Sequence, residues 1–177
     1  MSLNTALAIS LGVLGAIATW LFLGPLGGAL AIWAAFIAWG AFFHNGGKEA
    51  GLQTTILNAA AGAVIAGITL MVAGAGIGAN LPAAVWPAIC VGIGVAAMVL
   101  LANVPLFASI PTQVYGFAST VALTLLGNAA GSLTSVSLAN PVIAIILSMA
   151  VGAVFGWISE KVAGMLVGSG SHRTAKA

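Results

Sequence analysis

Residues able to do acid–base, nucleophilic or metal chemistry are scarce in this chain. Of its 177 residues, two are Asp or Glu, four are Lys or Arg, two are His and one is Cys. Glu49 follows Lys48, and Glu160 precedes Lys161, so each carboxylate lies beside a cation at the edge of an apolar segment. No nucleophile–base pair, catalytic carboxylate pair or metal-ligand spacing can be assembled from these residues. We therefore expect neither an enzyme nor a metal or other cofactor.

The polar side chains that remain are neutral, and several recur along one apolar stretch. Gln113, Thr120 and Thr124 follow one another at the spacing of a single helix face, and Asn128 continues the same spacing. Such a stripe has two interpretations: it hydrogen-bonds a neighbouring helix, or it lines a path for a small neutral solute. The candidate lining residues are Asn58, Gln113, Tyr115, Thr120, Thr124 and Asn128.

The elements that position these side chains are predicted to be membrane helices. Hydrophobic residues make up 62% of the chain and charged residues 3%, whereas a soluble domain carries about 25% charged residues. So few charges cannot cover a water-exposed surface, and a net charge of +2 makes no basic patch for nucleic acid. Because the apolar runs are continuous rather than alternating, helices are favoured over a barrel. The sequence predicts an all-α, polytopic protein whose solvent is the lipid bilayer.

Glycine, proline and short polar runs divide the chain into about six transmembrane helices. One domain, residues 1–167, precedes an expected flexible tail, 168–177. Pro105 and Pro111 bracket a short apolar piece, so the segment 103–112 is either a surface turn or a broken, re-entrant segment. The expected helices are 4–23, 25–43, 51–75, 83–102, 112–131 and 141–166.

The few cations predict an orientation. With six spans, Lys48, Lys161, Arg173 and Lys176 all fall on one side of the membrane, together with both termini. Lys and Arg are in excess in cytoplasmic loops, so the N- and C-termini are expected to be cytoplasmic.

Small residues at four-residue spacing predict close helix packing, because they let two backbones approach in lipid. Gly127 with Gly131, and Gly152 with Gly156, are two such pairs. The spacing leaves open whether these interfaces lie within one chain or between copies.

Three glycine- and proline-containing features occur in a fixed order along the chain: Gly46-Gly47 and Gly51-Leu52 after the second segment, Pro111 to Phe117 at the start of the fifth, and Gly152 with Gly156 in the last. Their order resembles that of an uncharacterised, YcdZ-like family of small bacterial inner-membrane proteins. The likeness covers about residues 5–165. It implies a multi-pass protein of the bacterial inner membrane and no established activity.

The stretch Val114-Tyr115-Gly116-Phe117 carries a fainter likeness. It is similar to the stretch that opens the pore helix in one half of a bacterial urea transporter, although Ala118 stands where that family has Asn. The family's Asn-rich motif is reduced here to Asn45-Gly46-Gly47. The likeness implies a passive channel for a small uncharged solute.

Two functions from different classes follow. The first is a passive channel or facilitator for a small uncharged, urea-like solute, acting as a homo-oligomer. The second is a structural or accessory subunit whose polar stripe binds a partner membrane protein. Affinity purification in mild detergent distinguishes them, because a stoichiometric foreign partner would favour the accessory subunit and a pure homo-oligomer would favour the channel.

Overall fold

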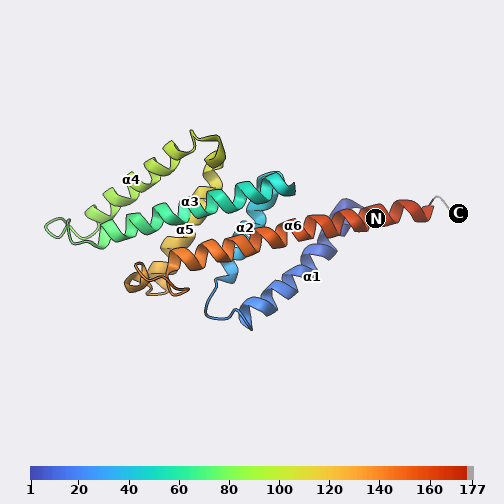
Figure 1. Ribbon diagram of the computed structural model, residues 1–177, viewed down its shortest axis with the longest axis horizontal. Coiled ribbons are helices and arrows are strands. Elements are labelled where there is room, and N and C mark those ends of the chain that lie inside the picture. The colour runs from blue at the N-terminus through green and yellow to red at the C-terminus, as the bar shows by residue number, and fades with distance from the viewer. Residues whose placement is uncertain (175–177) are drawn as a thin grey trace.

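The computed structural model describes residues 1–174, with side chains up to Gly168. Within these residues the chain is all-α, as predicted (Figure 1). The last three residues of the expected tail, 175–177, lie outside the described residues, and the part up to Thr174 continues the last helix. The elements are α1 (Leu3–Leu23), α2 (Ile32–His44), α3 (Lys48–Gly74), α4 (Val85–Leu101), the 3-10 helix η1 (Pro105–Phe107), α5 (Ile110–Leu126), the 3-10 helix η2 (Ala130–Ser132) and α6 (Pro141–Thr174).

The six predicted helices are present, but among the described residues only α1, α3 and α6 are long and apolar enough to cross a membrane. Helices α4 and α5 have 17 residues each. Helix α2 has 13 residues, which at about 1.5 Å per residue falls short of a hydrocarbon core of about 30 Å. The prediction of about six helices is confirmed, whereas α2 is shorter than a full span and α4 and α5 lie at the lower limit of about 17 residues.

Helix α2 begins well after the expected start at residue 25, because residues 24–30 form a series of turns. The Gly24 N–H is donated to the Trp20 carbonyl, and Gly28 has a φ of 79° that disfavours other residues. A second boundary differs at the end of α5, where Gly127 closes the helix at Leu126 rather than at residue 131. Both boundaries differ from the prediction because the backbone turns within a stretch of sequence that is mainly apolar.

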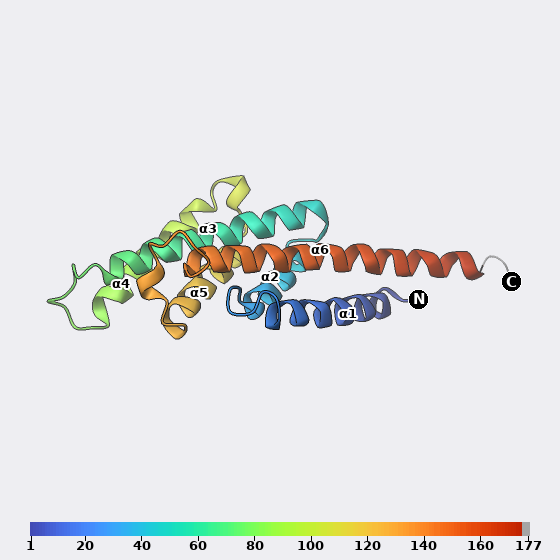
Figure 2. The ribbon, with the colours of Figure 1, turned by 60° about the horizontal axis from the view of Figure 1, so that its bottom comes forward.

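Helices α3 and α6 run side by side in opposite directions through the centre of the molecule (Figures 1 and 2). Helices α4 and α5 pack against α3, whereas α1 and α2 pack against α6. The N-terminus, the start of α3 and the C-terminal part of α6 share one end of the elongated molecule.

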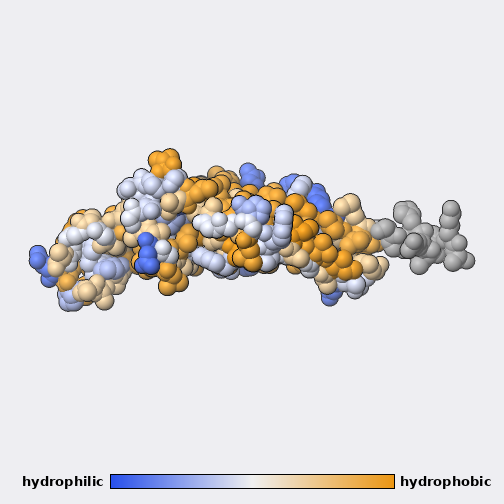
Figure 3. All heavy atoms as spheres, turned by 90° about the horizontal axis from the view of Figure 1, so that it is seen from below, coloured by the Kyte–Doolittle hydropathy of each residue, from blue (hydrophilic) through white to orange (hydrophobic). Residues whose placement is uncertain are grey.

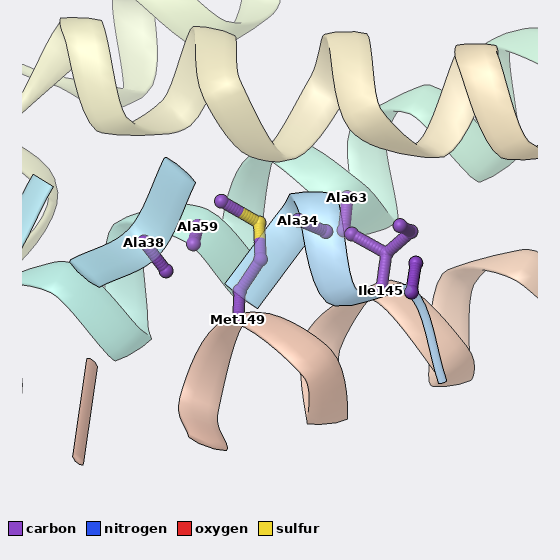
Figure 4. Close-up of a cluster of buried hydrophobic side chains, with 7 residues drawn as sticks. Ala34, Ala38, Ala59, Ala63, Ile145 and Met149 are labelled. Carbon is purple, nitrogen blue, oxygen red and sulfur yellow. The ribbon is translucent and has the colours of Figure 1, made fainter. Parts of the chain in front are cut away.

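The core lies where α2, α3 and α6 meet, and its members are mostly alanine (Figure 4). Because a methyl group is small, the three backbones approach closely there, which is how helices gain packing energy in lipid. Ile145 and Met149 of α6 supply the larger side chains, and both are fully buried. The cluster consists of Ala31, Ala34, Ala38, Ala59, Ala63, Ile145 and Met149.

Large apolar side chains also cover the outside. Trp20, Leu23 and Leu126 are each more than half exposed, and the face in Figure 3 is mostly apolar or neutral in hydropathy. Extensive exposed apolar surface marks contact with lipid or protein rather than with water.

Candidate functional site

The connector between α4 and α5, residues 102–109, is held against the middle part of α3 by the side chain of Asn58. Asn58 is fully buried, and its Oδ1 accepts a hydrogen bond of 3.1 Å from the backbone N–H of Ser109. Its Nδ2 donates to the carbonyl of Thr54 at 2.9 Å and to that of Leu106 at 3.3 Å. An irregular backbone segment thus packs against the middle part of α3, a helix that is long enough to span a membrane.

Asn45, which follows α2, ties three elements together on the other side of the same connector. Its Nδ2 lies 2.9 Å from Thr55 Oγ1 on α3 and 2.9 Å from Thr112 Oγ1 on α5. Its Oδ1 accepts a bond of 2.7 Å from the Ser109 hydroxyl. Both threonines are fully buried, so these bonds satisfy groups that would otherwise be costly to remove from water.

Gln113 completes the arrangement and leaves one acceptor unused. Its Nε2 donates to the Phe107 carbonyl and, at 3.3 Å, to Asn58 Oδ1. The side chain is fully buried, yet its Oε1 accepts no hydrogen bond from any described residue. Most buried polar atoms in folded proteins have a partner, so this oxygen is a place where a donor is missing. We call Asn45, Thr55, Asn58, Ser109, Thr112 and Gln113 the polar cluster.

The close crossing of α3 and α5 brings the polar cluster together. A Cβ added to Gly62 would overlap the backbone carbonyl of Gln113, and one added to Gly116 would overlap that of Ala59. Two glycines therefore let the helix backbones touch, which places Gln113 beside Asn58.

The rest of the predicted stripe does not join Asn58 and Gln113. Thr120 and Thr124 are buried, and their hydroxyls donate to carbonyls one turn earlier in α5, at 2.9 Å to Gly116 and 2.7 Å to Thr120. Hydroxyl groups bonded to their own helix present little polarity to a neighbour.

Tyr115 and Asn128 lie elsewhere again. Tyr115 is half-buried and faces a surface hollow of about 530 Å³ that it shares with His44 and residues of α2. Asn128 lies beyond the end of α5, exposed, with a φ of 53°. The expectation that Asn128 continues the helix face is wrong, because the helix has already ended.

The four predicted packing glycines divide into two groups. A Cβ at Gly152 would overlap the carbonyl of Ala35, and one at Gly156 would lie 2.8 Å from the Phe42 ring, so α6 and α2 meet there. At Gly127 the nearest atom is the carbonyl oxygen of Leu123 in the same helix, and Gly131 has nothing within 4 Å.

Four charged residues gather at one end of the molecule, which we call the charged end: Lys48, Glu49, Glu160 and Lys161. The sequence neighbours do not pair; instead Lys161 Nζ lies 2.7 Å from Glu49 Oε1. Glu160 Oε2 accepts a bond of 2.8 Å from the Lys48 backbone N–H at the start of α3. These contacts join the beginning of α3 to the C-terminal part of α6. Arg173 and Lys176 have no described side chains.

No three His, Cys, Asp or Glu side chains come close enough to hold a metal ion in the part of the chain that the structure describes. A cavity of about 450 Å³ lies at the opposite end from the charged residues, beside the turns between α1 and α2. Its lining includes Gly28, Ala29 and Leu30 of those turns, Leu123 of α5 and Ala144 of α6.

The comparisons with known proteins place this chain in a family. The family described as protein of unknown function DUF1097 matches residues 8–164. The chain belongs to this family. The match covers α2 to α5 in full and so contains every residue of the polar cluster of this DUF1097 protein. An uncharacterised family is thereby confirmed, whereas the YcdZ-like label and the likeness to a urea transporter stay predictions. No curated protein and no solved structure matches the chain.

Four members of the cluster, Asn45, Thr55, Ser109 and Thr112, were not among the predicted site residues. Asn45 stands in a short polar run that reads as an ordinary loop, and Ser109 precedes a proline-containing helix start. Their polarity was visible in the sequence, but their common location depends on how α2, α3 and α5 cross.

Proposed function

We propose that this protein is a passive facilitator for a small uncharged solute that carries N–H or O–H donors, such as urea, ammonia or water. The observation that supports the proposal most directly is the unpartnered, fully buried Oε1 of Gln113. A free acceptor can form a hydrogen bond with an N–H or O–H group of a passing solute. That bond replaces one that the solute made to water before it entered the protein.

The neutral character of the interior supports the same proposal. The cluster consists of amides and hydroxyls, while Lys48, Glu49, Glu160 and Lys161 lie together at the charged end. An ion on its way past Asn58 would meet no opposite charge from these groups. A neutral solute would meet donors and acceptors that match its own.

The proposal places the protein in the bacterial inner membrane, with both termini and the charged end in the cytoplasm. The Lys48 and Lys161 side chains at one end agree with the excess of cations on the cytoplasmic side. We propose further that copies associate as a homo-oligomer, because α2, with 13 residues, is too short to span the bilayer alone.

Stopped-flow light scattering on proteoliposomes tests the proposal, with urea, ammonia, glycerol and water as solutes. The protein is expected to accelerate at least one of these fluxes over empty vesicles. Gln113→Met keeps the length of the side chain and removes its oxygen, together with the Nε2 that donates to Phe107 and Asn58. It should slow that flux by about tenfold, the factor for one lost hydrogen bond to the solute.

The matched control is Thr112→Val, which removes a hydroxyl from the same cluster and keeps the Gln113 oxygen. If Thr112→Val slows the flux as much as Gln113→Met, the oxygen has a structural role only and the proposed path is wrong. Absence of any flux, together with a stoichiometric foreign protein after purification in mild detergent, would overturn the proposal in favour of an accessory subunit.

A further inference from the structure

The two short helices α2 and α5 begin in the same way, on different long helices. Ser109 is the last residue before α5, and its N–H is bonded at 3.1 Å to the side chain of Asn58 on α3. Ala31 is the last residue before α2, and its N–H is bonded at 2.9 Å to the side chain of Ser148 on α6. In both cases a turn-rich connector ends against a buried polar side chain inside a long helix.

The crossing points of these helices correspond as well. A Cβ at Gly62 of α3 would overlap the carbonyl of Gln113 in α5, and a Cβ at Gly152 of α6 would overlap the carbonyl of Ala35 in α2. Gln113 and Ala35 are each the fourth residue of their helix. The difference in residue number between Gly62 and Gly152 equals that between Asn58 and Ser148. Two independent contacts therefore relate α3 to α6 by the same difference in residue number, which we call the offset.

A third correspondence joins the outer helices. Ser10 of α1 donates a bond of 2.8 Å to the carbonyl of Ser159 on α6. A Cβ at Gly94 of α4 would meet the hydroxyl of Thr69 on α3. Thr69 and Ser159 again show the offset of the first two pairs. Helix α4 therefore lies on α3 as α1 lies on α6.

The core of Figure 4 contains the point where the two sets meet. Ala59 of α3 and Met149 of α6 are counterparts by the same offset, and they belong to one buried cluster. Because α3 and α6 run in opposite directions, a twofold axis between Ala59 and Met149 exchanges the two ends of the molecule.

We propose that the chain is an inverted repeat of two three-helix units, α1–α3 and α4–α6, whose connectors 24–31 and 102–109 open alternately to opposite sides of the membrane. Inverted repeats built around interrupted helices are a common architecture of transporters, with the solute site where the repeats meet. The repeat stands on the contacts alone. The alternate opening of the connectors rests on the proposed function, because it would be the way in which the solute crosses the membrane.

The two units differ in the structure at the connectors, which is the difference that alternate opening requires. Beside 24–31 lies the cavity of about 450 Å³, and Leu123 is part of its wall. The counterpart of Leu123 in the other unit is Asn45, at the offset that relates Ala35 to Gln113. Asn45 fills that place with hydrogen bonds to Thr55, Thr112 and Ser109. The connector at the charged end is closed, and the one at the opposite end borders open space.

If the two three-helix units exchanged their conformations, the connector 102–109 at the charged end would open and the connector 24–31 would close. The polar cluster is the element that decides between the states, because it holds 102–109 shut. Weakening it should therefore act on both ends at once.

Thiol labelling from each side of the membrane tests this coupling. In a Cys90→Ala background, Ala29→Cys reports on the first connector, and its counterpart Phe107→Cys reports on the second. A membrane-impermeant maleimide is applied to oriented vesicles from the periplasmic or the cytoplasmic side. Asn58→Ala and Asn45→Ala are the cluster-breaking variants. Asn103→Ala, an exposed asparagine with a local bond to Leu100, is the matched control.

The expected result is reciprocal. Each cluster-breaking variant should raise cytoplasmic labelling of Phe107→Cys and lower periplasmic labelling of Ala29→Cys, both by roughly fivefold or more, the factor for one buried hydrogen bond lost from one state. Labelling that rises at Phe107→Cys alone means local loosening and overturns the proposal, as does labelling that changes at neither position.

If Asn58→Ala fails to fold, Asn45→Ala, at a half-buried side chain, carries the test. Labelling requires no solute, so wild-type protein without flux but with reciprocal labelling would refute the proposed function and leave the repeat in place.

Discussion

The Oδ1 of Asn58 accepts the backbone N–H of Ser109 across 3.1 Å, although 51 residues of chain separate them. This bond fixes where the connector ends and α5 begins. It also explains why an asparagine occupies the middle part of an apolar helix: the amide satisfies backbone groups that helix formation cannot reach.

Asn58→Ala should lower the free energy of unfolding by about 2–3 kcal/mol, because the N–H of Ser109 and the carbonyl of Leu106 lose their buried partner. Thermal unfolding in mild detergent, followed by circular dichroism, measures the change. Asn103→Ala serves as the control and should stay within about 0.5 kcal/mol of the wild type. Equal stability of the two variants would show that the connector does not depend on Asn58.

Gly152→Ala should destabilise the protein by about 2 kcal/mol or more, because the added methyl group would overlap the carbonyl of Ala35 and push α2 from α6. Gly92→Ala, inside α4 with nothing within 4 Å of the new methyl group, should instead stabilise it by up to about 1 kcal/mol through helix propensity. The two unfolding midpoints should move in opposite directions. A similar shift for both variants would contradict the α2–α6 contact.

Thr120→Val and Thr124→Val should leave solute flux unchanged, in contrast to Gln113→Met. Their hydroxyls are bonded to carbonyls of their own helix and offer nothing to a passing molecule. The measurement is the stopped-flow flux, made on all three variants at matched protein-to-lipid ratio. A flux that falls for the two threonine variants as for Gln113→Met would restore the simple stripe along α5 as the path.

Glu49→Gln should lower the midpoint of thermal unfolding less than Glu160→Gln does, because its 2.7 Å ion pair with Lys161 lies at an exposed position where solvent screens it. Glu160→Gln should lower the midpoint measurably. Its carboxylate accepts the Lys48 backbone N–H at the start of α3, where negative charge is favoured by the helix dipole. The result would be contradicted if Glu49→Gln had the larger effect.

The helical class and the positions of the six helices follow from the sequence, because long continuous apolar runs leave a chain in lipid few other ways to satisfy its backbone. The start of α2 does not follow. Residues 24–30 contain no polar side chain, so the apolar run continues through them, and the bond from the Ala31 N–H to Ser148 fixes the place where the helix begins.

The candidate site could be predicted in part. Asn58 and Gln113 stand out as polar residues in apolar segments, and the structure places them 3.3 Å apart. Tyr115, Thr120, Thr124 and Asn128 share their polarity but not their location. Spacing along one helix indicates which residues can share a face, whereas the neighbour of that face is decided by the helix packed against it.

The sequence by itself determined that this protein is helical, apolar and almost without charge, since these properties follow from its composition and from the length of its continuous apolar runs. Only the tertiary structure decided which buried neutral groups find partners and which one among the described side chains, the oxygen of Gln113, does not. The physical reason is the crossing at Gly62 and Gly116, where two backbones come into contact because neither residue has a side chain. A hydrogen bond acts over about 3 Å, so its partners are chosen by such crossings and not by distance along the chain.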